Sequence, residues 1–425
     1  MPRGVGVILK QAKMEFATLV RLLLHKHSHK IYSEWPQMQR NLTAINSGTR
    51  LDWLDALRGV AVLGVVFVHA SQLSRNSGIL GKLAEFGQNG VQLFFVISAL
   101  TISMTYESHL RQFGSSCQAQ AGWLTKRFFR IAPLYYAAAV FYAGEQWLIY
   151  RVTQHRYGHA IYPVSGYVAN FAFLHTWIPS ANNNIVPGGW SIGVEMFFYL
   201  LIPPLYLIKN KHHRMAWLTL LGALLLVVSA LANRAASGSF YVPDNSYFYY
   251  WFPTQAPVLI LGLLFFAWQG GALRSAQAVV PRGVALAGVV ICLVVGAILG
   301  TWSEVFPLLA PTVLGVAFVL LVAMCCAGAP AILISRPMVL LGQLSYSIYI
   351  CHMFVLDVVR AVAVKIAWQR EGMMSLMLIF FIAVVGSSFL AMMTKRWIED
   401  PAIRYGHLLA RRLSEWKRPS LAEAH

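Results

Sequence analysis

The sequence predicts an all-α membrane protein, a polytopic helical bundle of about ten transmembrane helices with both termini in the cytoplasm. Two observations carry this prediction. Apolar residues make up 57% of the 425 residues and charged residues only 12%, whereas a soluble domain carries about a quarter charged residues. The apolar residues also gather in runs of about 20, the length that crosses a bilayer core about 30 Å thick.

Ten apolar runs qualify as membrane spans. They cover residues 53–73, 89–108, 131–150, 190–208, 215–232, 251–269, 283–301, 305–326, 339–364 and 374–395. A shorter run, 165–178, is bounded by Pro163 and Pro179. We expect it to be re-entrant or interfacial, since non-helical backbone at membrane depth is tolerated where it is buried in protein or lines a cavity.

Basic residues set the predicted orientation. The chain has 34 Lys and Arg against 16 Asp and Glu, a net charge of +18. With a cytoplasmic N-terminus and no crossing by 165–178, most basic residues fall on the cytoplasmic side, as the positive-inside rule requires. The exceptions are Arg151, Arg156, Arg234 and Arg370. Because the charges lie in short loops between apolar runs, we expect a multi-pass protein of the inner (cytoplasmic) membrane in contact with lipids, and no nucleic-acid partner.

Three regions are expected along the chain. Residues 1–50 form a basic extension whose apolar stretch at 16–24 is compatible with an interfacial helix. Residues 51–404 form the transmembrane domain, and 405–425 a short cytoplasmic tail. Four of the five Cys lie in apolar stretches without metal-ligand spacing, so no metal site and no disulfide framework are expected. The oligomeric state stays open.

The first predicted span contains two ionisable residues, Arg58 and His69. Such residues cost several kcal/mol in a membrane helix unless they face the protein interior or a water-filled cavity. Eleven residues apart on a helix, they project from nearly the same face and are separated by about 16 Å. His is a suitable general base, since its pKa lies near neutrality. Alternatively, Arg58 reaches the membrane surface and His69 only makes a hydrogen bond within the bundle.

Three further motifs could carry chemistry. Arg127 and Arg130 precede the third span, where their guanidinium groups suit phosphate binding or simply flank a helix. Glu195, about one turn into an apolar span, could pair with a His or Arg, accept a proton, or be a structural partner. His352 is either structural or catalytic, and Asp357 and Arg360 beyond it have the spacing of a helical ion pair.

Aromatic residues are frequent in the predicted outer loops. They suit sugar rings, but they also anchor helices at the membrane interface. They are Tyr150, Tyr157, Tyr162, Tyr167, Phe171, Phe173, Trp177, Tyr241, Tyr247, Tyr249, Tyr250 and Trp251.

From about residue 51 to about 404, the chain resembles the acyltransferase-3 family of integral membrane O-acyltransferases, which includes bacterial O-antigen and exopolysaccharide acetyltransferases. The stretches that carry the resemblance are Leu54–Arg58 with His69, Gly90–Ser98, Arg127–Arg130, Trp190–Glu195, Ser345–His352 and Glu399–Pro401. Each motif alone is a weak sign of the family, and the resemblance rests on the presence of all of them in this order. One residue departs from the pattern: Ala99 stands where the family usually has Gly.

The resemblance implies about ten transmembrane helices and transfer of an acyl group, usually acetyl, from cytoplasmic acetyl-CoA or another acyl-CoA. The acceptor would be a hydroxyl of a carbohydrate or lipid-linked glycan at the outer side of the membrane. His69 would be catalytic, with Arg58 as its essential partner and Glu195 as a further active-site acid, and Arg127, Arg130 and Arg58 would bind the CoA donor. We expect Trp190, Ser191 and His352 to contact the acceptor.

His69 could act by either of two routes, deprotonating the acceptor or first taking the acyl group itself. Family members that acylate peptidoglycan can carry an extra hydrolase-like domain, so a chain that ends near 425 favours a lipid-linked sugar or a small molecule as acceptor. The main alternative function is a proton-coupled transporter of a small solute, which would also bury His, Arg and Glu. A further alternative is a non-catalytic membrane scaffold.

Overall fold

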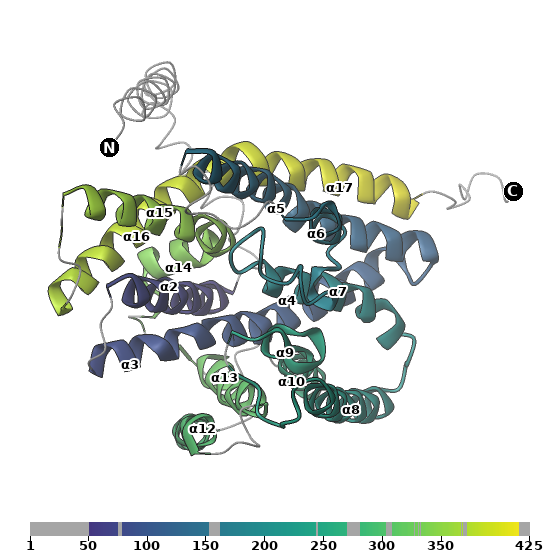
Figure 1. The fold of residues 1–425 in the computed structure, drawn as a ribbon. Helices are drawn as coiled ribbons and strands as arrows, with labels where there is room; N and C mark the ends of the chain where they lie inside the picture. The colour runs from purple at the N-terminus through teal and green to yellow at the C-terminus, as the bar shows by residue number, and fades with distance from the viewer. Residues whose placement is uncertain are drawn as a thin grey trace, which may run out of the picture. The chain divides into compact units, whose positions relative to one another are not determined.

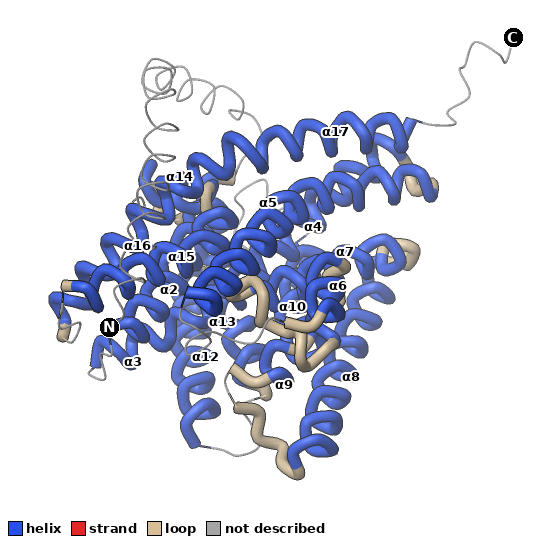
Figure 2. The backbone as a smooth tube through the Cα atoms, turned by 45° about the horizontal axis from the view of Figure 1, so that its top comes forward, coloured by secondary structure: helices blue, strands red, loops and turns tan. Residues whose placement is uncertain are grey.

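The computed structural model describes residues 51–74, 79–152, 162–243, 245–269, 281–302, 308–326, 328–329, 331, 333–366, 368 and 372–415. Within these ranges every regular element is a helix, as Figure 2 shows. The predicted N-terminal extension and the end of the predicted tail lie outside the described residues. The chain divides into two units, and all contacts reported below lie within the larger one, Trp53–Gly144 with Ile161–His425.

Every predicted span falls on a helix. These are α2 (Asp52–Ser74), α4 (Gly90–Phe113), α5 (Cys117–Val152), α7 (Gly189–Leu205), α8 (Lys211–Ser237), α10 (Phe252–Gln269), α12 (Arg282–Trp302), α13 (Ala310–Cys326), α14 (Arg336–Gln343) followed by α15 (Ser345–Lys365), and α16 (Met373–Thr394). Among the described residues, six helical stretches are long and apolar enough to cross a membrane. Crossing by all ten runs, and the side on which each terminus lies, remain predictions.

The segment 165–178 does not form one long helix. It contains α6 (Val164–Phe171) and the short helix η2 (His175–Trp177), separated by a turn in which Phe173 has φ of 56°. Neither piece approaches the roughly 20 residues that a crossing helix needs. The re-entrant or interfacial position of segment 165–178 in the membrane stays a prediction.

Helix α5 begins much earlier than the hydropathy pattern indicates. It starts at Cys117, so Arg127 and Arg130 lie on its helical surface and not in a loop before it. Ala, Gln, Leu, Lys and Arg, which are good helix formers, make up more than half of residues 117–130. The polar and basic residues among them lower the hydropathy without breaking the helix. Pro133 lies inside the helix.

The end of the described chain is also continuously helical. Helix α16 passes through a π-helical turn, Lys395–Glu399, into α17 (Asp400–Glu415). The α17 helix packs on α5, where the rings of Tyr405 and Phe129 lie 5.3 Å apart. Residues 405–415, the start of the predicted tail, are therefore part of a packed helix.

Close backbone contacts position the helices around α2 and α4. Helix α14 meets the start of α2 at Gly342, where an added Cβ would lie 1.6 Å from the carbonyl oxygen of Asp55. Helix α10 packs against α4, α8 and α13 (Figure 1). At its contact with α4, a Cβ on Gly262 would lie 2.6 Å from the Ala99 Cβ. The methyl group of Ala99, the residue that departs from the family pattern, thus fits because its neighbour is glycine.

Candidate active site

One face of α7 connects two groups of polar side chains. Ser191, Glu195 and Tyr199 follow one another at four-residue spacing, so they share a face that extends over about 12 Å. Ser191 and Tyr199 are buried and Glu195 is half-buried. We name the group around Ser191 the imidazole cluster, and the group around Glu195 and Tyr199 the arginine cluster.

The imidazole cluster consists of His69, His352, Tyr349 and Ser191. The arginine cluster consists of Arg58, Arg127, Arg130, Glu195 and Tyr199. Every predicted site residue except Trp190 therefore belongs to one of the two clusters.

Arg58 is held in the bundle by two hydrogen bonds. It donates from Nη1 to Asp55 Oδ1 at 2.9 Å and from Nη2 to Thr101 Oγ1, on α4, at 3.2 Å. Its side chain is 17% exposed, and it interacts electrostatically with Arg130 and Glu195. These contacts direct Arg58 to neighbouring helices of the bundle.

A relay of polar groups joins α5 to α7. The Tyr199 hydroxyl donates to Glu195 Oε1 at 2.7 Å and is itself hydrogen-bonded to Arg127. Arg127 also interacts electrostatically with Glu195 and Arg130, and its guanidinium lies 5.5 Å from the Trp123 ring centroid. Glu195 is thus connected to Arg127 through the Tyr199 hydroxyl, and whether it pairs with an Arg, accepts a proton or is only a structural partner stays a prediction.

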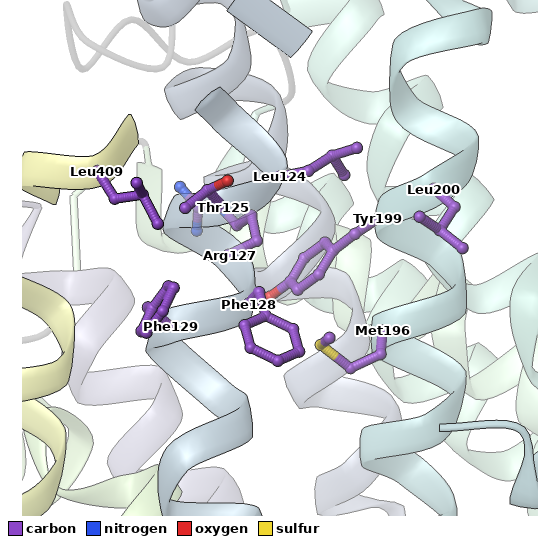
Figure 3. A pocket seen from close by; sticks show the side chains of 9 residues that line it. All are labelled: Leu124, Thr125, Arg127, Phe128, Phe129, Met196, Tyr199, Leu200 and Leu409. Carbon is purple, nitrogen blue, oxygen red and sulfur yellow. The ribbon is translucent and has the colours of Figure 1, made fainter. Parts of the chain in front are cut away.

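A pocket of about 300 Å³ opens beside this relay (Figure 3). Arg127 and Tyr199 are its principal polar side chains, and most of the remaining lining is apolar. The lining comes from α5, α7 and α17 and consists of Leu124, Thr125, Arg127, Phe128, Phe129, Met196, Tyr199, Leu200 and Leu409. This volume is at the lower end for ligand pockets, which range from about 300 to 1,000 Å³, so the pocket suits a narrow arm of a ligand and not a whole coenzyme.

In the imidazole cluster, the rings of His69 and His352 lie side by side with centroids 5.2 Å apart. His69 Nδ1 lies 3.0 Å from Gln72 Oε1, and His352 Nδ1 lies 2.7 Å from the carbonyl oxygen of Tyr349. The Tyr349 hydroxyl in turn lies 3.0 Å from Ser191 Oγ. His69 on α2, His352 on α15 and Ser191 on α7 are thus brought together from distant parts of the chain.

His175 supports the start of α7 beside this cluster. It is buried, its Nε2 donates to the carbonyl oxygen of Gly189 at 2.9 Å, and its ring stacks on Tyr135. Burial lowers the pKa of His175, which favours the neutral form.

The aromatic residues near α7 pack mainly on one another. Trp190 is buried and stacks on Tyr250 with ring centroids 4.6 Å apart. Trp177 packs against Phe252 and Trp251. Structural packing therefore accounts for these rings, and sugar binding by Trp190 stays a prediction.

The sequence prediction missed several partners. Tyr199 lies four residues after Glu195, and Asp55 three before Arg58, so helical spacing could have indicated both. Thr101 and the pair formed by the Ser347 hydroxyl with buried Glu399 arise from contacts between distant segments. Glu399 also interacts electrostatically with Arg130. The predicted ion pair of Asp357 and Arg360 is confirmed at 3.4 Å.

Across the described part of the chain, no group of three or more His, Cys, Asp or Glu is placed to hold a metal ion.

Comparison with known proteins identifies the family of this chain. Residues 51–393 match the acyltransferase-3 family model, described as "Acyltransferase domain". The peptidoglycan O-acetyltransferase OatA of Listeria monocytogenes is 27% identical over 329 residues, which cover 70% of this chain and 48% of that protein. The chain thus spans about half the length of this relative. No solved structure matches the chain. With most of its length matched by the family model and several helices fit to cross a membrane, this chain belongs to the acyltransferase-3 family and is a multi-pass membrane protein.

Proposed function

We propose that this protein is a membrane O-acyltransferase that moves an acyl group, by expectation acetyl, from cytoplasmic acyl-CoA to a hydroxyl of a carbohydrate acceptor at the outer side of the membrane. One observation carries the proposal: a single helix face joins a cationic cluster beside a pocket to a pair of imidazoles. The cationic cluster suits an anionic donor, and the pair of imidazoles suits acyl transfer.

The charge of the arginine cluster supports an anionic donor. Arg58 and Arg127 each interact electrostatically with Arg130, and the Nε of Arg127 is buried without a hydrogen-bond partner among the described residues. On α17, His407 lies within electrostatic range of Lys126, Arg127 and Arg130. Guanidinium groups match phosphate oxygens in geometry as well as charge. In our proposal the CoA phosphates bind here, and the apolar pocket receives part of the pantetheine arm.

The imidazole cluster supports the chemical step. His69 is half-buried beside His352, and its Nδ1 hydrogen bond to Gln72 leaves Nε2 available. Through Nε2 it could remove the proton of the acceptor hydroxyl or take the acyl group first. Proton transfer by a positioned base contributes about 10²- to 10⁴-fold in rate.

The acceptor class is proposed from the chemistry of the relative. A peptidoglycan O-acetyltransferase is among the similar proteins, so peptidoglycan fragments are the first acceptors to test. Exopolysaccharide, O-antigen and other lipid-linked glycans are the next ones.

The proposal is tested by CoA release from acetyl-CoA in detergent-purified protein, measured as free thiol with a panel of these acceptors. We expect release that depends on an acceptor and falls about 10²- to 10⁴-fold in the His69→Ala variant. The matched control is His213→Ala, since His213 is exposed at the start of α8. Normal release by a well-folded His69→Ala protein would exclude His69 as the catalytic residue.

The same preparation separates the proposal from a proton-coupled transporter. A transporter with this fold would neither bind acetyl-CoA nor release CoA, and in proteoliposomes it would move a solute with protons. Acetyl-CoA binding that is weakened by Arg127→Ala would favour the acyltransferase even if the acceptor panel lacked the natural substrate.

A further inference from the structure

The hydrogen bonding of His352 fixes which of its nitrogens carries hydrogen. Nδ1 lies 2.7 Å from the carbonyl oxygen of Tyr349. A carbonyl oxygen can only accept, so Nδ1 is the donor. His352 is 1% exposed, and burial disfavours the charged imidazolium. In the neutral ring the other nitrogen, Nε2, therefore keeps a free lone pair.

This Nε2 is an acceptor without a donor. It is buried and has no hydrogen-bond partner among the described residues. Leaving a buried polar atom unsatisfied is costly, so such atoms in native proteins call for an explanation such as a catalytic role or a missing ligand or water.

The neighbouring imidazole cannot satisfy it. His69 Nδ1 lies 3.0 Å from Gln72 Oε1, and with this amide orientation the oxygen accepts, so His69 too carries hydrogen on Nδ1. In their neutral forms the two imidazoles, whose centroids lie 5.2 Å apart, therefore each present an Nε2 lone pair. Neither can donate to the other, and both are ready for an external group.

We propose that the two imidazoles divide the reaction between them: His69 Nε2 takes the acyl group, and His352 Nε2 takes the proton of the acceptor hydroxyl. The inference rests on the acyltransferase function proposed above, and it selects the covalent route for His69. His352 becomes a catalytic residue, where the sequence left it either structural or catalytic.

The reaction proceeds in two chemical steps through an acyl-imidazolium on His69. His69 Nε2 attacks the thioester carbonyl, the N–C bond forms, the C–S bond breaks, and the CoA thiolate leaves and takes a proton from solvent. The acceptor oxygen then attacks the acyl-imidazolium while its proton passes to His352 Nε2. The C–N bond breaks, which restores the lone pair of His69, and His352 returns its proton to solvent. The products are the ester and free CoA.

The test compares two reactions in the purified protein. The first is exchange of label between acetyl-CoA and free CoA without acceptor, which needs only the acyl-enzyme. The second is transfer to the glycan acceptor. The informative variant is His352→Asn, because the Asn amide can still donate to the Tyr349 carbonyl but has no group in the position of Nε2.

We expect His352→Asn to retain exchange while transfer falls about 10²- to 10⁴-fold, and His69→Ala to lose both reactions. His352→Gln, which places an amide near the Nε2 position, should keep the acceptor KM but lose kcat. Retained exchange also shows that the variant is folded and binds its donor.

Transfer at wild-type rate by His352→Asn would overturn the proposal. So would loss of exchange together with transfer in that variant, or a wild type that transfers without any exchange. Failure of the proposed function itself looks different, because the wild type would then neither transfer nor bind acetyl-CoA.

Discussion

The two clusters on the α7 face differ in how their polar groups are satisfied. In the arginine cluster, charged groups have partners: Arg58 forms an ion pair with Asp55, and the Tyr199 hydroxyl connects Arg127 to Glu195. In the imidazole cluster, neither ring is hydrogen-bonded to a carboxylate among the described residues, and the Nε2 of His352 has no partner. The first arrangement fixes side chains for binding, and the second leaves lone pairs free for reaction. Substitutions in the first should therefore reduce stability and donor binding, whereas those in the second should reduce rate.

The largest expected effect comes from the backbone contact behind Arg58. Gly342→Ala would place a Cβ 1.6 Å from the Asp55 carbonyl oxygen, so α14 and α2 must move apart. We expect a loss of more than about 4 kcal/mol of unfolding free energy, the range of severe core defects. Thermal unfolding in detergent measures it. The control is Gly283→Ala, where no atom lies within 4 Å of the added Cβ and helix propensity favours Ala by up to about 1 kcal/mol. Equal unfolding temperatures of the two variants would refute the contact.

The two clusters should differ most clearly in the stability of the variants Arg58→Met and His69→Ala. Removing one partner of a buried ion pair costs about 3–5 kcal/mol, so Arg58→Met should be clearly destabilised as well as inactive. We expect His69→Ala to lose no more than about 1 kcal/mol, the centre of the range for point mutants, although its transfer rate collapses. Denaturation curves and CoA release on the same samples provide both numbers. Similar losses of stability in the two variants would contradict the proposal that the arginine cluster stabilises the bundle and the imidazole cluster does not.

A smaller effect is expected at the relay in the arginine cluster. Tyr199→Phe removes the hydroxyl between Arg127 and Glu195, and a typical hydrogen bond contributes about 0.5–1.5 kcal/mol. The acetyl-CoA KM should therefore rise about 2- to 10-fold with little change in kcat. Tyr405→Phe serves as the control, because Tyr405 is exposed on α17. A change in kcat alone would instead connect Tyr199 to the imidazole cluster.

The smallest effect concerns pH. Because burial lowers the pKa of His175 below that of the unfolded chain, protonation favours unfolding. The contribution of His175 to stability is complete above its ordinary pKa of about 6.5 and decreases as the pH falls below it. His175→Gln can keep the hydrogen bond to Gly189 without titrating. Between pH 7.5 and 5.5, the unfolding temperature of this variant should decrease less than that of the wild type. Equal decreases in the two proteins would exclude His175 as a cause of the loss of stability at low pH.

Much of this arrangement is visible in the sequence because it depends on local spacing. Apolar runs locate the helices, and helical periodicity places Arg58 and His69 on one face and Tyr199 one turn after Glu195. The start of α5 at Cys117 was not predicted, since hydropathy detects membrane spans and not their polar extensions. The contact of His69 with His352, the bond of Arg58 to Thr101, and the pairing of Ser347 with Glu399 join distant segments. No spacing rule encodes such contacts.

In the proposed mechanism, donor and acceptor reach the α7 face from opposite ends. Sealed proteoliposomes sorted by orientation test it most directly, with labelled acetyl-CoA on one side and peptidoglycan fragments on the same or the opposite side. We expect label to reach the acceptor only when the two substrates are on opposite sides, with acetyl-CoA on the side of the arginine cluster. We also expect His69→Ala to abolish the transfer. Transfer only when both substrates are on the same side would contradict it.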